Sequence, residues 1–288
     1  MDDSQMIELA FLIKEEEDKE LKKLLENAEY QFIDLLMEYI LLVEIMIEDA
    51  FQTDYEELQN IVDKLIQKFK KKTPTEKQLK RAMKNRSFDS TMKNEIVPEL
   101  EAAFFALLEV FKKQYGSDLP FDENSEAYKE LKDWSKKLPS QLRETTDNTV
   151  SRELDKYYEK DDEEKKKGIS LAELAVFGYV RARSIAILEI TRMYGGSQYE
   201  AMMLNRHVIG STWRHADGVK EPRPAHVSAD GMTAAKGEFF YINGTFIRYP
   251  RDPLAPIEET IYCHCWLDPI FDRSKNEIEY EIEKPPVD

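Results

Sequence analysis

The chain has 288 residues, 34% of them charged, and a formal net charge of −16 at pH 7. This length suits one large domain or two ordinary ones, and the negative charge disfavours indiscriminate binding to DNA or acidic membranes. Two cysteines are too few for a disulfide framework. The most apolar stretch, residues 32–47, contains three acidic residues, so we expect no membrane partner.

Residues 1–168 are predicted to form long helices, since eight of the ten glycines lie after Gly168. Between residues 31 and 72 the acidic side chains fall within an arc of about 140°, which leaves a broad apolar helix face. Thr73-Pro74-Thr75-Glu76 predicts a new helix with Thr73 as its N-cap. Pro98 is predicted to begin another helix that ends near residue 114. Further helix is predicted through Trp134 and again from about Asn148.

Gly168 is the predicted boundary of the N-terminal region. The run Ser170-Leu171-Ala172-Glu173 is a capping box that predicts a helix continuing to Tyr194. Gly195-Gly196 is predicted to end that helix, because glycine favours helix C-termini. Ser197-Gln198-Tyr199-Glu200 is then predicted to cap the next helix.

Beyond about Ile209 the pattern becomes typical of strands. Asn243-Gly244, between two runs of aromatic and β-branched residues, predicts a hairpin with a type I′ turn. A last strand is predicted near residues 260–267. The sequence therefore predicts an α+β protein, with a helical region at 1–168, a small domain with an antiparallel sheet at 169–268, and an acidic tail at 269–288.

Basic side chains gather in an otherwise acidic first half. Residues 64–93 hold eleven Lys or Arg against two acidic residues, whereas residues 1–60 have a balance of −14. Two basic stripes on successive helices can follow a phosphate backbone. The favoured alternative is a solvated face that neutralises the acidic helices. The candidates for DNA contact are Lys64, Lys68, Lys71, Lys72, Lys77, Lys80, Arg81 and Lys84.

All four histidines and both cysteines lie between His207 and Cys265. Cys263 and Cys265 share one face of a strand, and with His226, together with His207 or His215, they are candidate Zn²⁺ ligands. The usual zinc spacing is C-x₂-C, however, and free cysteines are commonly buried in protein cores. The sequence therefore favours two buried thiols, and we expect no cofactor.

A second group of polar residues, Arg223, His226 and Asp230, lies within eight positions. Such residues can perform acid–base chemistry or contact phosphate, but they can equally form a buried polar network. No nucleophile elbow, phosphate-binding loop or zinc-hydrolase motif accompanies them. The structural network is therefore the favoured interpretation, and we expect no enzymatic activity.

Arg181, Ile185 and Glu189 recur at every fourth position and so share one helix face. A buried Glu189 requires a cationic or hydrogen-bonding partner, for which Arg223 and the Trp213 indole are candidates.

Several fragments resemble family motifs. The helix at 181–191 is similar to R-A-x-x-I-A-x-T-E, with Leu188 in place of threonine before Glu189, and Trp213 is similar to a tryptophan that follows a short helix. Glu221-x-Arg223-x-x-His226 with Asp230-Gly231 is similar to R-x-x-H…D-G. The run Tyr249-Pro250-Arg251-Asp252-Pro253, followed by residues 258–265, is similar to Y-P-x-D-P…C-R-C, with His264 in place of arginine.

In this order, over roughly residues 176–266, these fragments resemble the phage head morphogenesis family, the Mu F-like minor head proteins of tailed phages. The resemblance implies a minor capsid protein that associates with the portal protein during prohead assembly and influences DNA packaging or delivery. The major capsid protein, the scaffolding protein and double-stranded DNA are further candidate partners. The implied location is the virion, inside the head near the portal, and the host cytoplasm during assembly.

Two other functions stay open at this point. One is a metal-dependent enzyme that uses His226, Asp230, Cys263 and Cys265. The other is a DNA-binding module formed by the basic helices at 64–93.

Overall fold

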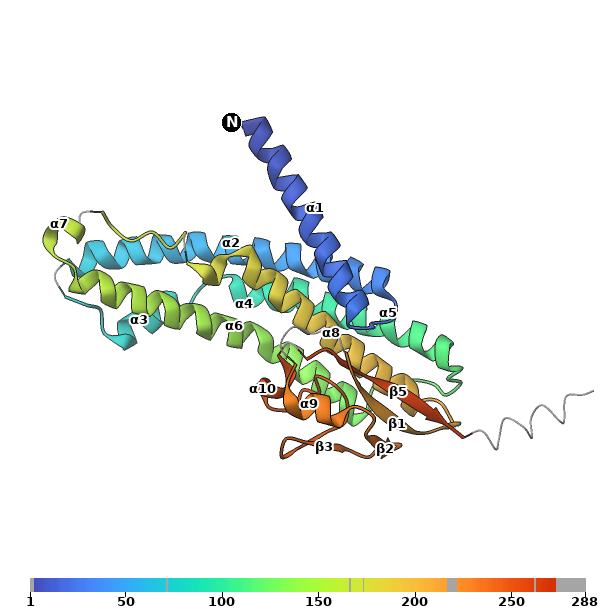
Figure 1. Ribbon diagram of the computed structural model, residues 1–288. Helices are drawn as coiled ribbons and strands as arrows, with labels where there is room; N and C mark the ends of the chain where they lie inside the picture. Colours follow the sequence, from blue (N-terminus) through green and yellow to red (C-terminus); the bar gives the residue numbers. More distant parts are fainter. Residues whose placement is uncertain are drawn as a thin grey trace, which may run out of the picture. The chain divides into compact units, whose positions relative to one another are not determined.

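The computed structural model describes residues 3–70, 72–165, 167–172, 174–216, 222–261 and 263–272, without side chains at 3–13 and 162. Lys71, Glu173, Glu221 and residues 273–288 of the predicted tail lie outside the described residues. Long helices are followed by a small antiparallel sheet, which confirms the α+β class (Figure 1). The helices before the sheet are α1 (Asp3–Asn27), α2 (Ile33–Phe69), α3 (Glu76–Met83), α4 (Phe88–Thr91), α5 (Val97–Tyr115), α6 (Glu126–Glu159), α7 (Asp162–Lys165) and α8 (Tyr179–Met203).

The last quarter of the described chain is built from short elements. In order they are β1 (Val208–His215), α9 (Pro224–Ala229), β2 (Thr233–Ala235), β3 (Phe240–Ile242), β4 (Thr245–Ile247), α10 (Ile257–Thr260) and β5 (Cys265–Phe271). None of the helices in the described part of the chain combines the length and apolar character that a bilayer crossing requires.

Two compact units, each made of separate stretches of sequence, make up the chain. The first contains residues 1–38, 104–130 and 191–288, and the second contains residues 39–103 and 131–190. We call them the sheet unit and the helical unit. Gly168 lies inside the helical unit, and the boundary that we expect there stays a prediction.

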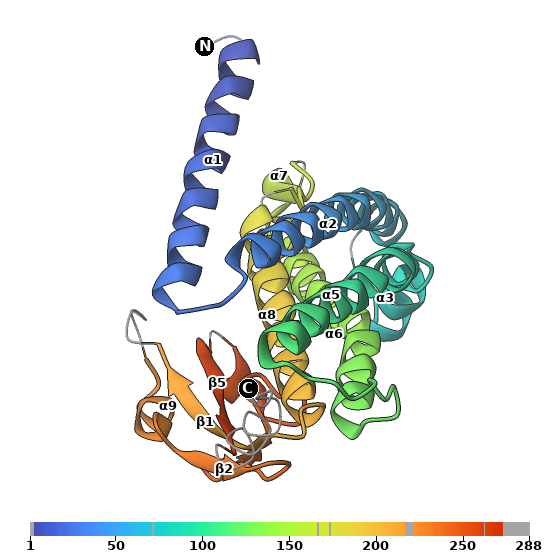
Figure 2. The ribbon, with the colours of Figure 1, turned by 90° about the vertical axis from the view of Figure 1, so that its right-hand side faces the viewer.

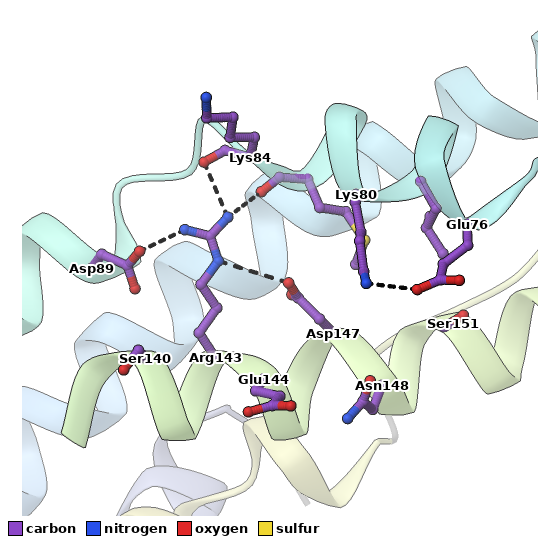
Figure 3. Close-up of a pocket in the computed structure, with 12 residues that line it drawn as sticks. Glu76, Lys80, Lys84, Asp89, Ser140, Arg143, Glu144, Asp147, Asn148 and Ser151 are labelled. Atoms are coloured by element: carbon purple, nitrogen blue, oxygen red, sulfur yellow. Dashed lines mark hydrogen bonds and ion pairs between the residues drawn. The ribbon is translucent and has the colours of Figure 1, made fainter. Parts of the chain in front are cut away.

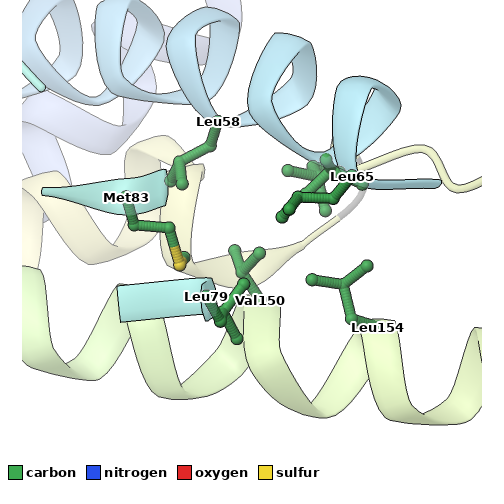
Figure 4. Packing of buried hydrophobic residues seen from close by; sticks show 8 residues of the cluster. Leu58, Leu65, Leu79, Met83, Val150 and Leu154 are labelled. Carbon is green, nitrogen blue, oxygen red and sulfur yellow. The ribbon is translucent and has the colours of Figure 1, made fainter. Parts of the chain in front are cut away.

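A core formed by three helices stabilises one end of the helical unit. Leucine and valine side chains of α2 and α6 enclose Leu79 and Met83 of the short helix α3 (Figure 4). Leu171, which follows α7, is also fully buried in this cluster. Burying such side chains contributes about 1.5–3 kcal/mol each, so this packing rather than intrinsic propensity holds the eight-residue helix α3.

The sheet unit contains two separate small sheets. Strand β1 is central in a three-stranded antiparallel sheet of order β2-β1-β5, and Figure 2 shows β1 beside β5. The hairpin β3–β4 forms the other sheet. Asn243 and Gly244 both have positive φ, at 49° and 80°, so the predicted hairpin and its I′ turn are confirmed. The last strand begins at Cys265, later than expected, because residues 257–260 form α10.

The predicted helix end at Gly195-Gly196 is wrong, because α8 continues unbroken to Met203. A Cβ atom built at Gly195 would lie 2.5 Å from the carbonyl oxygen of Pro250, so the loop backbone packs directly against the helix. This glycine therefore allows a close approach of two backbones rather than ending a helix. Ser197, expected to cap a new helix, instead donates to the carbonyls of Met193 and Phe104.

Three other helix starts also differ from the sequence expectation. The helix expected from the capping box at Ser170 begins only at Tyr179. The N-cap of α3 is Thr75 rather than Thr73, since Thr75 and Gln78 form the reciprocal capping box. The helix expected to begin at Pro98 starts earlier, because α4 continues through a π-helical turn, Met92–Ile96, into α5. Pro98 is the second residue of α5, in its first turn, where a residue without an N–H is tolerated.

Candidate metal centre

Three buried side chains that are common metal ligands converge in the sheet unit. The Nδ1 atom of His226 lies 3.5 Å from the Sγ atom of Cys263 and 3.5 Å from that of Cys265. The three atoms all lie within 4.8 Å of one another, and each residue is only 2% exposed. The structure thus brings together the candidate ligands that lie almost forty positions apart in the sequence.

Local structure explains how the three side chains meet. Pro224 provides the first turn of α9 with a fixed φ, and this helix carries His226. Cys265 begins β5, and Cys263 precedes it by two positions in a segment that follows α10, so both sulfurs reach His226. His215, at the end of β1, pairs with Cys265 across the sheet, and its Nδ1 atom lies 3.5 Å from the Cys265 sulfur.

Hydrogen bonds on the far side of the imidazole fix its tautomer. The Nε2 atom of His226 lies 2.9 Å from a carboxylate oxygen of Glu259. Asn243, in the hairpin turn, donates to the other carboxylate oxygen at 2.5 Å. An ionised carboxylate only accepts hydrogen bonds, so Nε2 carries a proton and Nδ1 is the ring nitrogen that faces the sulfurs.

The electrostatic environment distinguishes the two sulfurs. The contact with Cys265, supported by His226 and the Arg251 guanidinium, holds the pKa of the Cys263 thiol well below its usual value despite burial. The same pairing with Cys263, together with burial, raises the pKa of Cys265. The pKa values of the two thiols therefore shift in opposite directions, because the contact between the two sulfurs is the largest cause of both shifts.

The ring of Trp213 covers the imidazole of His226. The two rings meet edge to face with centroids 5.8 Å apart, and Phe240 packs on the indole at 5.4 Å. Trp213 is 1% exposed, so it separates this site from solvent. Such burial suits a fixed polar or metal centre better than a site that a substrate must enter.

The predicted network residues Arg223 and Asp230 lie around the same site but do not bind each other. Arg223 donates to the backbone carbonyl of Ile261, and Asp230 accepts from the backbone N–H of His215 at 3.0 Å. Asp230 does not belong to the buried ligand cluster, and neither does His207. Arg223 and Asp230 instead form hydrogen bonds with backbone groups next to the cluster, at Ile261 and His215 respectively.

Tyr249 and Asp252 form a second buried network in the sheet unit. Asp252 is fully buried and accepts from the guanidinium and the backbone N–H of Arg248. Arg248 also contacts Glu130. The Tyr249 ring packs on Tyr199 with centroids 5.1 Å apart and touches the helix at Gly195. These residues attach the loop at 248–252 to α6 and α8.

Arg181 and Glu189 belong to the helical unit. Glu189 accepts from the indole N–H of Trp134 at 2.9 Å, so the expected partners Trp213 and Arg223 are wrong. Arg181 donates to Thr146 and to two backbone carbonyls, and its guanidinium lies over the Phe51 ring. The Trp134 contact was missed because helix periodicity places a residue on a face without identifying the opposite helix.

The basic candidates for DNA contact are exposed wherever they are described. Lys80 and Lys84 line a cleft of about 570 Å³ in the helical unit, next to Arg143 of α6 (Figure 3). Four carboxylates line the same cleft, and Lys80 is paired with one of them, Glu76, at 2.6 Å. The cleft itself therefore does not favour a phosphate group.

Sequence reasoning missed the residues that support the cluster from outside. Glu259, Asn243 and Arg251 carry no motif that identifies them as partners of His226 or of the cysteines. Asn243 is recognisable as a turn residue, but its bond to Glu259 depends on how the hairpin packs. Arg251 has a φ of 65°, which is uncommon for a residue with a Cβ atom and marks a constrained loop.

Among proteins of known sequence, the chain is 29% identical over 195 residues to the uncharacterized protein YqbB of Bacillus subtilis (strain 168). The match covers 64% of this chain and 64% of YqbB, which is less than two thirds of that protein's length. No protein-family model matches the chain, and no solved structure matches it.

Proposed function

We propose that this protein is a minor head protein of a tailed phage that associates with the portal during prohead assembly. The observation that carries the proposal is the meeting of the separate fragments on which the family resemblance rests. Trp213 covers His226, Arg223 binds the backbone of Ile261, and both cysteines contact His226. Fragments matched by chance need not meet in space, whereas those of a shared domain should.

A role in assembly also agrees with the burial of the site. The residues of the buried cluster are about 2% exposed and are covered by Trp213, so they stabilise the sheet unit rather than bind a substrate. The net charge of −16 opposes general binding to DNA, so stable placement in a head requires a protein partner. The portal is the partner that the resemblance implies.

Quantitative mass spectrometry of gradient-purified phage heads tests the proposal. Heads assembled with and without the portal protein are compared, and the ratio of this chain to the major capsid protein is measured. We expect a few copies per head with the portal and loss of the chain without it. If the chain is absent from heads that contain the portal, the proposal fails.

We further propose that the exposed basic side chains contact packaged DNA. Charge reversal of Lys77, Lys80, Arg81 and Lys84 tests this part. Each lost phosphate contact should reduce the slope of log affinity against log salt by about 0.9. The matched control reverses four exposed lysines elsewhere, Lys22, Lys129, Lys136 and Lys156. Equal salt dependence in both variants and the unmodified protein contradicts the DNA contact but leaves the portal role intact.

A further inference from the structure

We propose that Cys263, Cys265 and His226 bind a structural Zn²⁺ ion, with Glu259 orienting the histidine from outside. This inference rests on the geometry of the buried cluster and is independent of the proposed role in phage heads. It also reverses the interpretation favoured by the sequence, in which the cysteines are two buried thiols.

The distances fit a tetrahedral zinc centre. With Zn–S near 2.3 Å and Zn–N near 2.0–2.1 Å, tetrahedral geometry separates a nitrogen and a sulfur ligand by about 3.6 Å. Both sulfurs lie 3.5 Å from Nδ1 of His226. One ion bound to all three atoms would account for both distances.

The far side of the imidazole has the environment that a metal-bound histidine usually has. Such a histidine donates its other N–H to a carboxylate or carbonyl, which fixes the ring and makes it a better ligand. Here a carboxylate oxygen of Glu259 lies 2.9 Å from Nε2 of His226, and Asn243 donates a hydrogen bond to the other carboxylate oxygen. This support comes from α10 and from the hairpin turn, two elements that carry no proposed ligand themselves.

His215 lies beside the cluster and contacts it through Cys265, but it is not one of the three residues whose ligand atoms gather within 4.8 Å. Its Nδ1 atom lies 3.5 Å from the Cys265 sulfur, the same separation as for His226. Asp230 accepts a hydrogen bond from the backbone N–H of His215 at 3.0 Å, and this bond fixes the end of β1. We assign the ion a structural role because its three ligands are each only 2% exposed and Trp213 packs against His226, which suits a fixed centre better than a site that a substrate must enter.

Burial gives the ion a clear energetic role. Two buried thiolates without a counterion are costly, whereas a divalent cation neutralises them and links α9 to β5 and to the segment that precedes β5. This link stabilises the small three-stranded sheet to which β5 belongs.

Metal analysis of the full chain tests the proposal. The chain is purified without chelators, and its zinc content is measured by plasma mass spectrometry. We expect about one zinc per chain, its loss in Cys265→Ser, and its retention in His264→Asn, a control that lies between the two cysteines. Adding a strong chelator should lower the Tm of the unmodified chain by at least about 5 °C.

Cobalt provides a readout that does not require a variant to fold. Adding Co²⁺ to the chelator-treated full chain should produce a sulfur-to-cobalt charge-transfer band together with the intense visible bands of tetrahedral coordination. If the folded chain takes up neither zinc nor cobalt, and both thiols react freely with a thiol reagent after brief denaturation, the cluster is a thiol network and the proposal is overturned.

A pair of glutamate variants tests the outer support. Glu259→Gln should weaken zinc binding by about 10–100-fold, measured by competition with a chromophoric chelator. The control is Glu258→Gln, which changes an exposed neighbouring residue and should leave zinc affinity unchanged. Equal affinities in the two variants contradict the positioning role of Glu259.

Discussion

Asp252 shows how much a single buried carboxylate can contribute to this fold. It accepts hydrogen bonds from the Arg248 guanidinium and from the backbone N–H groups of Arg248 and Leu254. In Asp252→Asn the buried guanidinium keeps only Glu130 as an acidic partner. We expect the free energy of unfolding to fall by about 3 kcal/mol, measured by urea denaturation.

The same substitution at an exposed ion pair is the matched control. Asp268 pairs with Arg214 at 2.7 Å, with about two fifths of each side chain exposed. Asp268→Asn should cost less than about 1 kcal/mol, since solvent screens such pairs. Similar losses in the two variants would show that burial does not determine the contribution of Asp252.

Asp54 gives the helical unit a pH dependence. Burial raises its pKa to about 6, although the neighbouring Arg86 opposes the shift. Because the folded pKa exceeds the unfolded value, the folded state binds an extra proton at pH 5. The stability that this proton contributes is lost as the pH rises through 6. As the pH rises from 5 to 7, the unmodified protein should lose about 1 kcal/mol of unfolding free energy that Asp54→Asn does not lose. The difference between the two proteins should therefore shift by that amount in favour of Asp54→Asn.

Denaturation curves of both proteins at the two pH values measure this difference. Asp147 also contacts Arg86, and burial raises its pKa as well, so it is left unchanged in both proteins. A difference that stays constant between pH 5 and pH 7 is incompatible with the raised pKa of Asp54.

At the residue scale, the sequence identified the side chains of the candidate site better than the residues to which they bond. Cys263, Cys265 and His226 could be named in advance because few side chains bind metals and all of them lie in one region. Glu259 could not be named, since its bond to His226 joins residues 33 positions apart through tertiary packing. The same limit led to the wrong partners for Glu189.

Among the elements, α8 depends on a glycine for its packing. In Gly195→Ala the new methyl group would meet the Pro250 carbonyl at 2.5 Å, and neither backbone can move freely. We expect a loss of about 1–3 kcal/mol in the free energy of unfolding, although alanine is the better helix former.

Gly178→Ala is the control for this variant. Its Cβ would lie 3.5 Å from the Ala175 carbonyl, an ordinary contact, and its φ of −76° suits alanine. This variant should be as stable as the unmodified protein or more stable by up to about 1 kcal/mol. A Gly195→Ala protein that unfolds with the same free energy would refute the close packing of helix and loop.

Elements with a strong local signal were predicted correctly. The helix at 33–69 follows from its apolar face, and the hairpin follows from Asn243-Gly244, because turn geometry depends on those two residues alone. Helix ends were less predictable. Thr73 and Thr75 both begin capping-box patterns, and only the structure shows that Thr75 is used. The α8 glycines suggested a helix end because the sequence does not reveal the loop that packs on them.

For the whole molecule, the discontinuous units determine which fragments can fold. A fragment of residues 169–288 lacks 1–38 and 104–130, which belong to the same unit as 191–288. It would lose the contacts of Tyr194 with Phe111 and of Asn205 with Tyr115. We expect this fragment to show no cooperative thermal unfolding by circular dichroism, whereas the full chain does. A sharp transition in the fragment would instead support an independent domain after Gly168.

The discontinuous sheet unit also has a consequence for synthesis on the ribosome. Residues 1–38 emerge first, but much of their unit begins at residue 191, about 150 positions later. At typical elongation rates of 5–20 residues per second, the nascent N-terminal segment waits on the order of ten seconds for these partners. During that interval buried residues such as Leu25 and Tyr30 are uncovered. Folding of this unit should therefore finish only after translation, and chaperones that bind apolar segments should increase its yield.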